Sequence, residues 1–244
     1  MIFLMLCTSI LAKKSFTNKE IREINIELKE CKNLIQEEKY KATQKKLSTL
    51  HDKYPDLDIT AWWSNYHQSL GRFHTKKNNF YEATIEYRKA FEYKPTEVTL
   101  NSLATAYIQN KQFFDASNLL ESNSKYISEI NRAKYEQKIA FAYAQMQNFQ
   151  GAIYRTKKLI SLQPKNLKHW TALSIYYMKN SQPEDALEVL EELETMRPLK
   201  RSEKELKIQA SQKTKIGNKL DVAVSSSFEV QLDNQKYREY IPTI

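Results

Sequence analysis

The sequence predicts an all-α protein built from repeated helical hairpins that stack into a solenoid, and three observations support this. Glycine occurs only 3 times in 244 residues, whereas average usage would give roughly seventeen. β-sandwiches, dinucleotide-binding folds and P-loops are therefore disfavoured, because they need glycine at positive φ or where phosphate approaches the backbone. Prolines recur near a 34-residue period, with Pro164 and Pro198 34 apart and Pro95 and Pro164 69 apart. Apolar residues recur at i, i+3, i+4 and i+7, as in amphipathic helices.

Composition indicates a foldable chain of one or two domains. It has 38 Lys and Arg against 29 Asp and Glu, a net charge of +9, and 41% hydrophobic residues. A chain of 244 residues can bury a hydrophobic core without disulfides. Cys7 and Cys31 are too few for a disulfide framework and lack the spacing of a zinc knuckle.

Residues 1–12 (MIFLMLCTSILA) carry no charge, and Lys13 and Lys14 follow them. A helix of twelve residues spans about 18 Å, too short for a bilayer core of about 30 Å. We therefore expect a signal peptide or its remnant and export to the periplasm, with a cytoplasmic protein as the alternative. Leu6 before Cys7 disfavours lipidation, and the missing basic region leaves open whether Met1 is the natural start.

Five units of about 34 residues follow, and the first is degenerate, with Thr43 where a small Ala is expected. The diagnostic residues, unit by unit, are Tyr40, Leu47, Leu50 and Pro55; Leu70, Gly71, Phe80, Ala83, Tyr87, Ala90 and Pro95; Leu103, Ala104, Tyr107, Phe113, Ala116 and Leu120; Ile139, Ala140, Tyr143, Phe149, Ala152, Leu159 and Pro164; and Trp170, Leu173, Ser174, Tyr177, Ala186, Leu190, Leu193 and Pro198. Over residues 19–198 this pattern resembles the tetratricopeptide repeat. The resemblance implies a right-handed α-α superhelix of four to five hairpins.

Helix packing explains the repeated residue types. Each unit needs a small residue on its first and second helix, so that the two backbones approach closely. A proline after the second helix removes an amide donor and starts the turn. One hairpin cannot bury its apolar face alone, so stacking is required.

Two segments lie outside the repeats. Residues 201–215 are polar with a few apolar positions, which predicts a capping helix and places the solenoid at residues 19–215. From residue 216 to 244 the period changes to two, as in Leu220, Val222 and Val224. We expect two short strands, or a disordered tail.

The sequence offers no catalytic constellation. It lacks the HExxH, CxxC, GxSxG and GxxxxGK[ST] motifs. His67 and His74 are two helical turns apart, too far for a zinc pair, and the carboxylates of residues 184–194 are expected to form a solvated face. We therefore expect no enzyme activity, no metal, no cofactor and no small-molecule substrate.

The family resemblance implies that ligands lie along the first helix of each unit. The corresponding residues are Asn65, Gln68, Arg72, Lys76, Asn101, Thr105, Lys134, Gln137, Phe141, Lys168, Thr171 and Ile175. Cations would steer an acidic or extended partner segment, amides would bond its backbone, and Phe141 would pack against an apolar side chain. The alternative is that these are ordinary solvent-facing residues.

The expected function is thus a non-catalytic protein-interaction scaffold. Residues 149–206 also resemble exported proteins that accompany TonB-type energy-transducing complexes, which gives a narrower alternative. A nucleic-acid binder is a third reading, since the pI is about 9.2. It is disfavoured because the basic residues are dispersed without an interleaved aromatic patch. Membrane association is expected only through the N-terminal segment.

Overall fold

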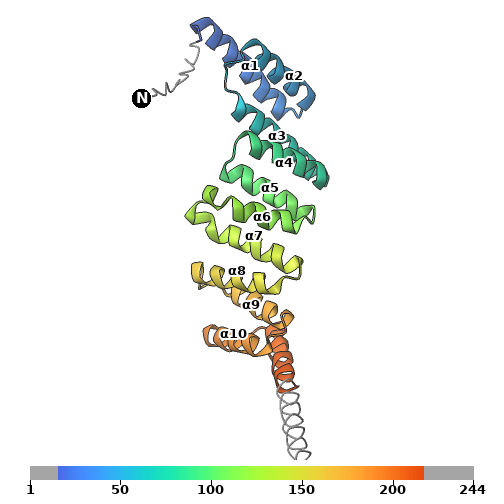
Figure 1. Ribbon diagram of the computed structural model, residues 1–244, viewed down its shortest axis with the longest axis vertical. Helices are drawn as coiled ribbons and strands as arrows, with labels where there is room; N and C mark the ends of the chain where they lie inside the picture. The colour runs from blue at the N-terminus through green and yellow to red at the C-terminus, as the bar shows by residue number, and fades with distance from the viewer. Residues whose placement is uncertain (1–15, 217–244) are drawn as a thin grey trace, which may run out of the picture. The chain divides into compact units, whose positions relative to one another are not determined.

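The computed structural model describes residues 16–216 as a chain of α-helices (Figure 1). The predicted signal peptide and the predicted strand-like tail both lie outside these residues. The helices are α1 (Asn18–Gln36), α2 (Tyr40–Lys53), α3 (Thr60–Lys76), α4 (Phe80–Tyr93), α5 (Glu97–Gln109), α6 (Phe113–Ser122), α7 (Arg132–Gln145), α8 (Phe149–Leu162), α9 (Leu167–Lys179) and α10 (Pro183–Met196), with short 3-10 turns η1 (Ser124–Tyr126) and η2 (Glu129–Asn131). Residues 201–216 are also helical.

The chain divides into two compact units, which are described separately. The first ends at Ile127 and contains α1 to α6, and the second begins at Ser128 and contains α7 to α10 and the helical residues 201–216. Within each unit, helices that follow one another along the chain pack together. The division comes directly after the repeat that lacks a closing proline.

All five hairpin turns have the same backbone structure. Each has one residue with φ between 57° and 59°, and none of these is glycine: Glu38, Asn78, Lys111, Gln147 and Ser181. In the third turn, Lys111 N–H donates to the Ile108 carbonyl at 3.1 Å and Gln112 N–H donates to the Tyr107 carbonyl at 2.8 Å. This pair of bonds is a Schellman motif. The turns therefore adopt the left-handed conformation without glycine.

The small residues predicted at helix contacts are buried. Gly71 lies in α3 against α4, and a Cβ placed there would come within 2.8 Å of the Tyr87 ring. On the second helices, Ala83, Ala116 and Ala152 have no exposed surface. Close approach of the backbones thus depends on these positions.

Two side-chain caps fix helix starts in the first unit. Thr17 and Glu20 form a capping box at α1, and Thr96 and Thr99 form one at α5. Such caps satisfy amide groups that have no partner within the helix. α3 begins at Thr60, ten residues before Leu70, the first diagnostic residue of the second unit.

The helical residues 201–216 are anchored to the second unit by Glu203, which is 2% exposed. Its carboxylate accepts hydrogen bonds from Arg197 at 2.7 and 2.8 Å and from Thr171 Oγ1 at 2.6 Å. The backbone N–H of Lys200 donates to it at 2.8 Å. These bonds hold the pKa of Glu203 at about 2, Arg197 being the largest cause. None of the helices within residues 16–216 has the length and hydropathy needed to cross a bilayer.

Candidate functional site

The twelve residues predicted to bind a partner fall into two sets of six, one in each unit. Asn65, Gln68, Arg72, Lys76, Asn101 and Thr105 lie on α3 and α5, and the other six lie on α7 and α9. Each set is therefore examined as a surface of its own unit.

In the first unit, the α3 residues contact neighbouring side chains. Gln68 donates to Ser102 Oγ on α5 at 3.1 Å, and Arg72 donates to Ser69 Oγ at 2.9 Å. Asn65 is exposed. The amide of Gln68 thus bridges two first helices.

The remaining first-unit residues also have partners within the chain. Lys76 Nζ lies 3.6 Å from a carboxylate oxygen of Glu38, and Thr105 Oγ1 donates to the Asn101 carbonyl at 2.7 Å. Lys76 is largely exposed, so its ion pair is weak. This surface is polar and mostly internally bonded.

In the second unit, the predicted residues repeat with a spacing of one unit. Lys134, Gln137 and Phe141 on α7 have the i, i+3, i+7 spacing of a single helix face, and Lys168, Thr171 and Ile175 follow 34 residues later on α9. We call these six residues the α7/α9 face.

Most of the α7/α9 face is accessible. Lys134, Gln137 and Lys168 are exposed. Phe141 is 41% exposed and Ile175 37% exposed. Thr171 is less accessible than the other residues of the face. Its hydroxyl donates to Glu203 and thus helps to anchor the helical residues 201–216. The face combines two ammonium groups that form no ion pair within residues 16–216 with two exposed apolar side chains.

The charge around this face is strongly positive. Residues 128–182 contain nine basic and two acidic residues. The basic residues are Arg132, Lys134, Lys138, Arg155, Lys157, Lys158, Lys165, Lys168 and Lys179.

Both acids of this segment are neutralised locally. Glu129 pairs with Arg132 at 2.6 Å, and the buried Glu136 pairs with Arg155 at 3.1 Å and with Lys158 at 2.5 Å. The remaining positive charge of residues 128–182 therefore has no acidic counterpart in the same segment.

α10 carries the opposite charge. It contains no basic residue and six acidic ones: Glu184, Asp185, Glu188, Glu191, Glu192 and Glu194. Lys207 Nζ lies 2.8 Å from Glu194 and 3.9 Å from Glu191. This row is the solvated acidic face that the sequence predicts, paired in part with the C-terminal helix.

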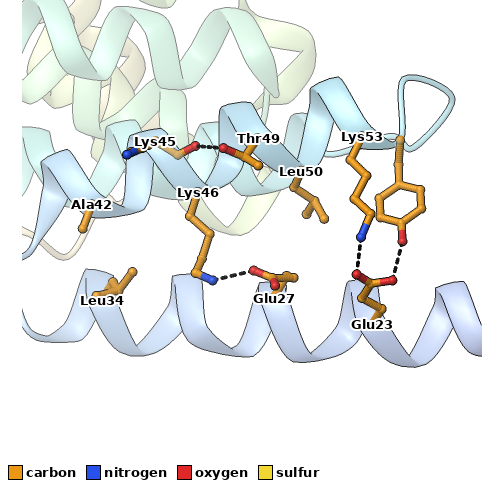
Figure 2. Close-up of a pocket in the computed structure, with 10 residues that line it drawn as sticks. Glu23, Glu27, Leu34, Ala42, Lys45, Lys46, Thr49, Leu50 and Lys53 are labelled. Atoms are coloured by element: carbon orange, nitrogen blue, oxygen red, sulfur yellow. Dashed lines mark hydrogen bonds and ion pairs between the residues drawn. The ribbon is translucent and has the colours of Figure 1, made fainter.

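A trough of about 440 Å³ lies between α1 and α2 (Figure 2). Figure 2 shows Lys46 reaching from α2 to Glu27 on α1, and Lys53 reaching to Glu23. Lys46 also pairs with Glu30 at 2.5 Å, and hydrogen bonds to its two acidic partners raise its pKa. Ion pairs cross the trough. They stabilise the α1–α2 hairpin and leave no open site between the two helices.

Sequence reasoning missed a polar cluster in the first unit. The spacing of His67 from His74 excludes a zinc pair and predicts no other role, yet His67 is buried on α3 and its Nδ1 lies 2.6 Å from the Glu86 carboxylate on α4. The two residues are 19 apart. Glu136 and Arg155 are also 19 apart and also paired, so this spacing within one hairpin was a usable signal.

No group of three or more His, Cys, Asp or Glu side chains within residues 16–216 is arranged to hold a metal ion.

No protein-family model matches the chain, and no curated protein matches it by sequence. Solved structures do. MamA protein aligns with a TM-score of 0.55 and 18% identity, over 75% of this chain and 97% of MamA. A tetratricopeptide repeat protein from Parabacteroides merdae aligns with a TM-score of 0.53 and 13% identity, over 85% of this chain and 80% of that protein.

A third similar structure is that of nearly identical TPR-like repeats from a Podosopora anserina putative kinesin light chain. It aligns with a TM-score of 0.52 and 18% identity, over 73% of this chain and 99% of that chain. These similarities confirm the predicted all-α tetratricopeptide fold. At such identities they show the fold alone.

Proposed function

We propose that this chain is a non-catalytic protein-interaction scaffold whose α7/α9 face captures an acidic, partly apolar segment of a partner protein. The observation that carries the proposal is the excess of positive charge in residues 128–182, which also hold the two exposed apolar side chains Phe141 and Ile175. Complementary charge speeds encounter and fixes orientation, and a buried apolar contact supplies affinity.

The residues have distinct roles in this capture. Lys134 and Lys168 form no ion pair within the described chain and attract carboxylates. Phe141 and Ile175 offer apolar surface to one or two hydrophobic side chains of the segment. Gln137 can donate to and accept from an extended backbone.

A fluorescent peptide with glutamates around a central Phe-Leu pair tests the proposal by anisotropy. The double variant Lys134→Glu and Lys168→Glu should weaken binding at least tenfold, because two attractions become repulsions. Lys204→Glu with Lys213→Glu is the matched control, since it makes the same change in net charge at exposed positions outside residues 128–182. Equal losses in both double variants would contradict the assignment of the face.

We further propose that the protein works in the periplasm after export directed by residues 1–12. What supports this is the uncharged run that ends at Ala12, followed by Lys13 and Lys14. Expression from the native gene, fractionation and N-terminal sequencing test it. Mature protein beginning near Lys13 in the periplasmic fraction is expected, and full-length protein confined to the cytoplasm would contradict it.

The narrower role as an accessory component of a TonB-type envelope complex rests on sequence resemblance over residues 149–206. It would gain support if the native protein co-purified with such a complex and the Lys134 and Lys168 variant did not. Co-purification of both proteins would place the contact elsewhere on the chain.

A further inference from the structure

A second recess lies in the first unit, and we call it the histidine recess. It has a volume of about 550 Å³ and is lined by Gln44, Trp63, His67, Lys89, Glu92 and Tyr93. Its residues come from α2, α3 and α4. His67 is two residues from Asn65 and thus about 160° away from it around α3, so the recess is distinct from the α3 face predicted to bind a partner.

Three nearly parallel rings line the recess. The His67 and Tyr93 ring centroids are 5.5 Å apart with an interplanar angle of 11°, and those of Trp63 and Tyr93 are 6.0 Å apart with an angle of 18°. Trp63 and His67 are 6.0 Å apart at 27°. Tyr93 is 42% exposed. Aromatic faces of this kind attract cations, and a planar cation lying parallel to them gains most.

The imidazole of His67 has a defined hydrogen-bonding state. Its Nδ1 lies 2.6 Å from Glu86 Oε2, and because an ionised carboxylate only accepts, Nδ1 carries the proton. In the neutral ring Nε2 is therefore an acceptor. No hydrogen bond to Nε2 is formed within residues 16–216, and His67 lines the recess.

Three charged side chains stand at or beside the recess, the acidic Glu86 and Glu92 and the basic Lys89, and Arg88 of α4 acts electrostatically on Glu92. Lys89 Nζ lies 2.9 Å from Glu86 Oε1, so these two charges offset each other. His67 and Lys89 together lower the pKa of Glu86 against the opposing effect of its burial, which keeps it ionised. Glu92 is exposed and forms no ion pair within the described chain. With the imidazole neutral, one acceptor nitrogen and one exposed carboxylate thus stand beside the aromatic rings.

We infer that the histidine recess binds a guanidinium group, supplied by an arginine side chain of a peptide or protein partner. Guanidinium is planar, stacks on aromatic rings and has five N–H donors. One edge can donate to His67 Nε2 and the Glu92 carboxylate while its face lies against Trp63 and Tyr93. An ammonium is a compact point charge without this stacking surface and fits the recess less well.

The equivalent place in the second unit shows what a purely structural pair looks like there. Glu136 and Arg155 have the same 19-residue spacing, and Lys158 also pairs with Glu136. The pair at His67 differs because the rings of Trp63 and Tyr93 stand beside it at the recess. Hairpin stabilisation alone does not require these features.

The probe is the blocked tripeptide acetyl-Gly-Arg-Gly-amide, titrated into the full-length protein at pH 8. The readout is the indole N–H resonance of Trp63 in a ¹H–¹⁵N NMR spectrum. Acetyl-Gly-Lys-Gly-amide is the charge-matched control, and free L-arginine separates a peptide side chain from a free guanidino compound. Glu92→Gln removes the free carboxylate, Tyr93→Leu removes a ring, and Glu82→Gln alters another exposed acid of α4.

The inference predicts a saturable shift of the Trp63 resonance with the arginine peptide. Affinity should fall about three- to fivefold in Glu92→Gln, the scale of one exposed ion pair, and further in Tyr93→Leu, while Glu82→Gln matches the wild type. The lysine peptide should bind at least threefold more weakly. Absence of a Trp63 shift, equal binding of both peptides, or binding of free arginine alone would overturn the inference.

Discussion

The approach of α3 to α4 depends on the absence of a side chain at Gly71. A Cβ there would lie 2.8 Å from two atoms of the Tyr87 ring, closer than van der Waals contact allows. The ring is buried and cannot move without a cost to its own packing.

Gly71→Ala should therefore destabilise the first unit by about 1–3 kcal/mol, the usual cost of overpacking. In a Tyr87→Leu background the same change should instead stabilise it by up to about 1 kcal/mol, because alanine favours helix over glycine. Urea unfolding followed at the Trp62 and Trp63 indole resonances measures both effects. Equal destabilisation in the two backgrounds would show that the ring is not the obstacle.

The positive-φ turn residues give a second prediction at this scale. Lys111 has φ 59°, and a non-glycine residue in the left-handed region costs about 1–2 kcal/mol. Lys111→Gly should stabilise the protein by about 0.5–1 kcal/mol after the entropy cost of glycine is deducted. Lys111→Ala is the control and should bring no such gain, since alanine has the same Cβ. A gain shared by both variants would refute the explanation.

Sequence reasoning identified the small packing residues because their spacing repeats and their neighbours are apolar. It could not identify the left-handed turns, since their residues, such as Glu38 and Lys111, share no side-chain type. The turn geometry comes from the Schellman hydrogen bonds of the backbone, which any residue can form at a cost. His67 and Glu86 were also missed, because a pair 19 residues apart becomes visible only when α3 and α4 are aligned against each other.

At the scale of the elements, the helical residues 201–216 depend on the carboxylate of Glu203. Its folded-state pKa of about 2 lies below the ordinary value of 4.5. A lowered folded pKa means that the unfolded chain binds the proton more readily. The stabilisation is therefore complete above about pH 5 and is lost as the pH falls toward 2.

We expect Glu203→Gln to destabilise the second unit by about 2–3 kcal/mol at pH 6 and by much less near pH 2. Glu205→Gln is the control, because its pair with Arg201 is exposed and contributes little. Urea unfolding at the Trp170 indole resonance, measured across this range, gives the difference between variant and wild type. A difference that stays constant with pH would contradict the assigned role of Glu203.

The elements themselves were largely predictable, since amphipathic periodicity and the closing prolines set helix ends to within a few residues. The early start of α3 was not predictable, because residues Thr60 to Trp63 lie before the diagnostic residues of the second repeat unit. The sequence also did not predict the division of the chain after Ile127, although the third repeat unit lacks a closing proline.

At the scale of the molecule, positive charge is concentrated by segment. Residues 128–182 hold nine basic against two acidic residues, while α10 holds six acidic residues and no basic one. The net charge of +9 is a sum over the whole chain and describes neither segment. The sequence contained this contrast, but the neutralisation of Glu129 and Glu136 required the structure.

The association rate of the acidic peptide should therefore depend on ionic strength. Raising salt from 50 to 300 mM should slow wild-type association several-fold, because the Debye length shortens to below about 10 Å. The Lys134→Glu and Lys168→Glu variant should associate more slowly and show a flatter dependence. Stopped-flow fluorescence measures both rates, and parallel salt curves for the two proteins would exclude steering by these lysines.

The most direct test of the scaffold is site-specific photo-crosslinking in native cells. A photo-reactive amino acid replaces Phe141 on the α7/α9 face in one strain and the exposed Tyr154 of α8 in another. We predict that a discrete partner is crosslinked from position 141, that position 154 does not capture it, and that Lys134→Glu with Lys168→Glu abolishes the crosslink. Capture of the same partner from position 154, or a crosslink at 141 that survives the charge reversal, would contradict capture by the α7/α9 face.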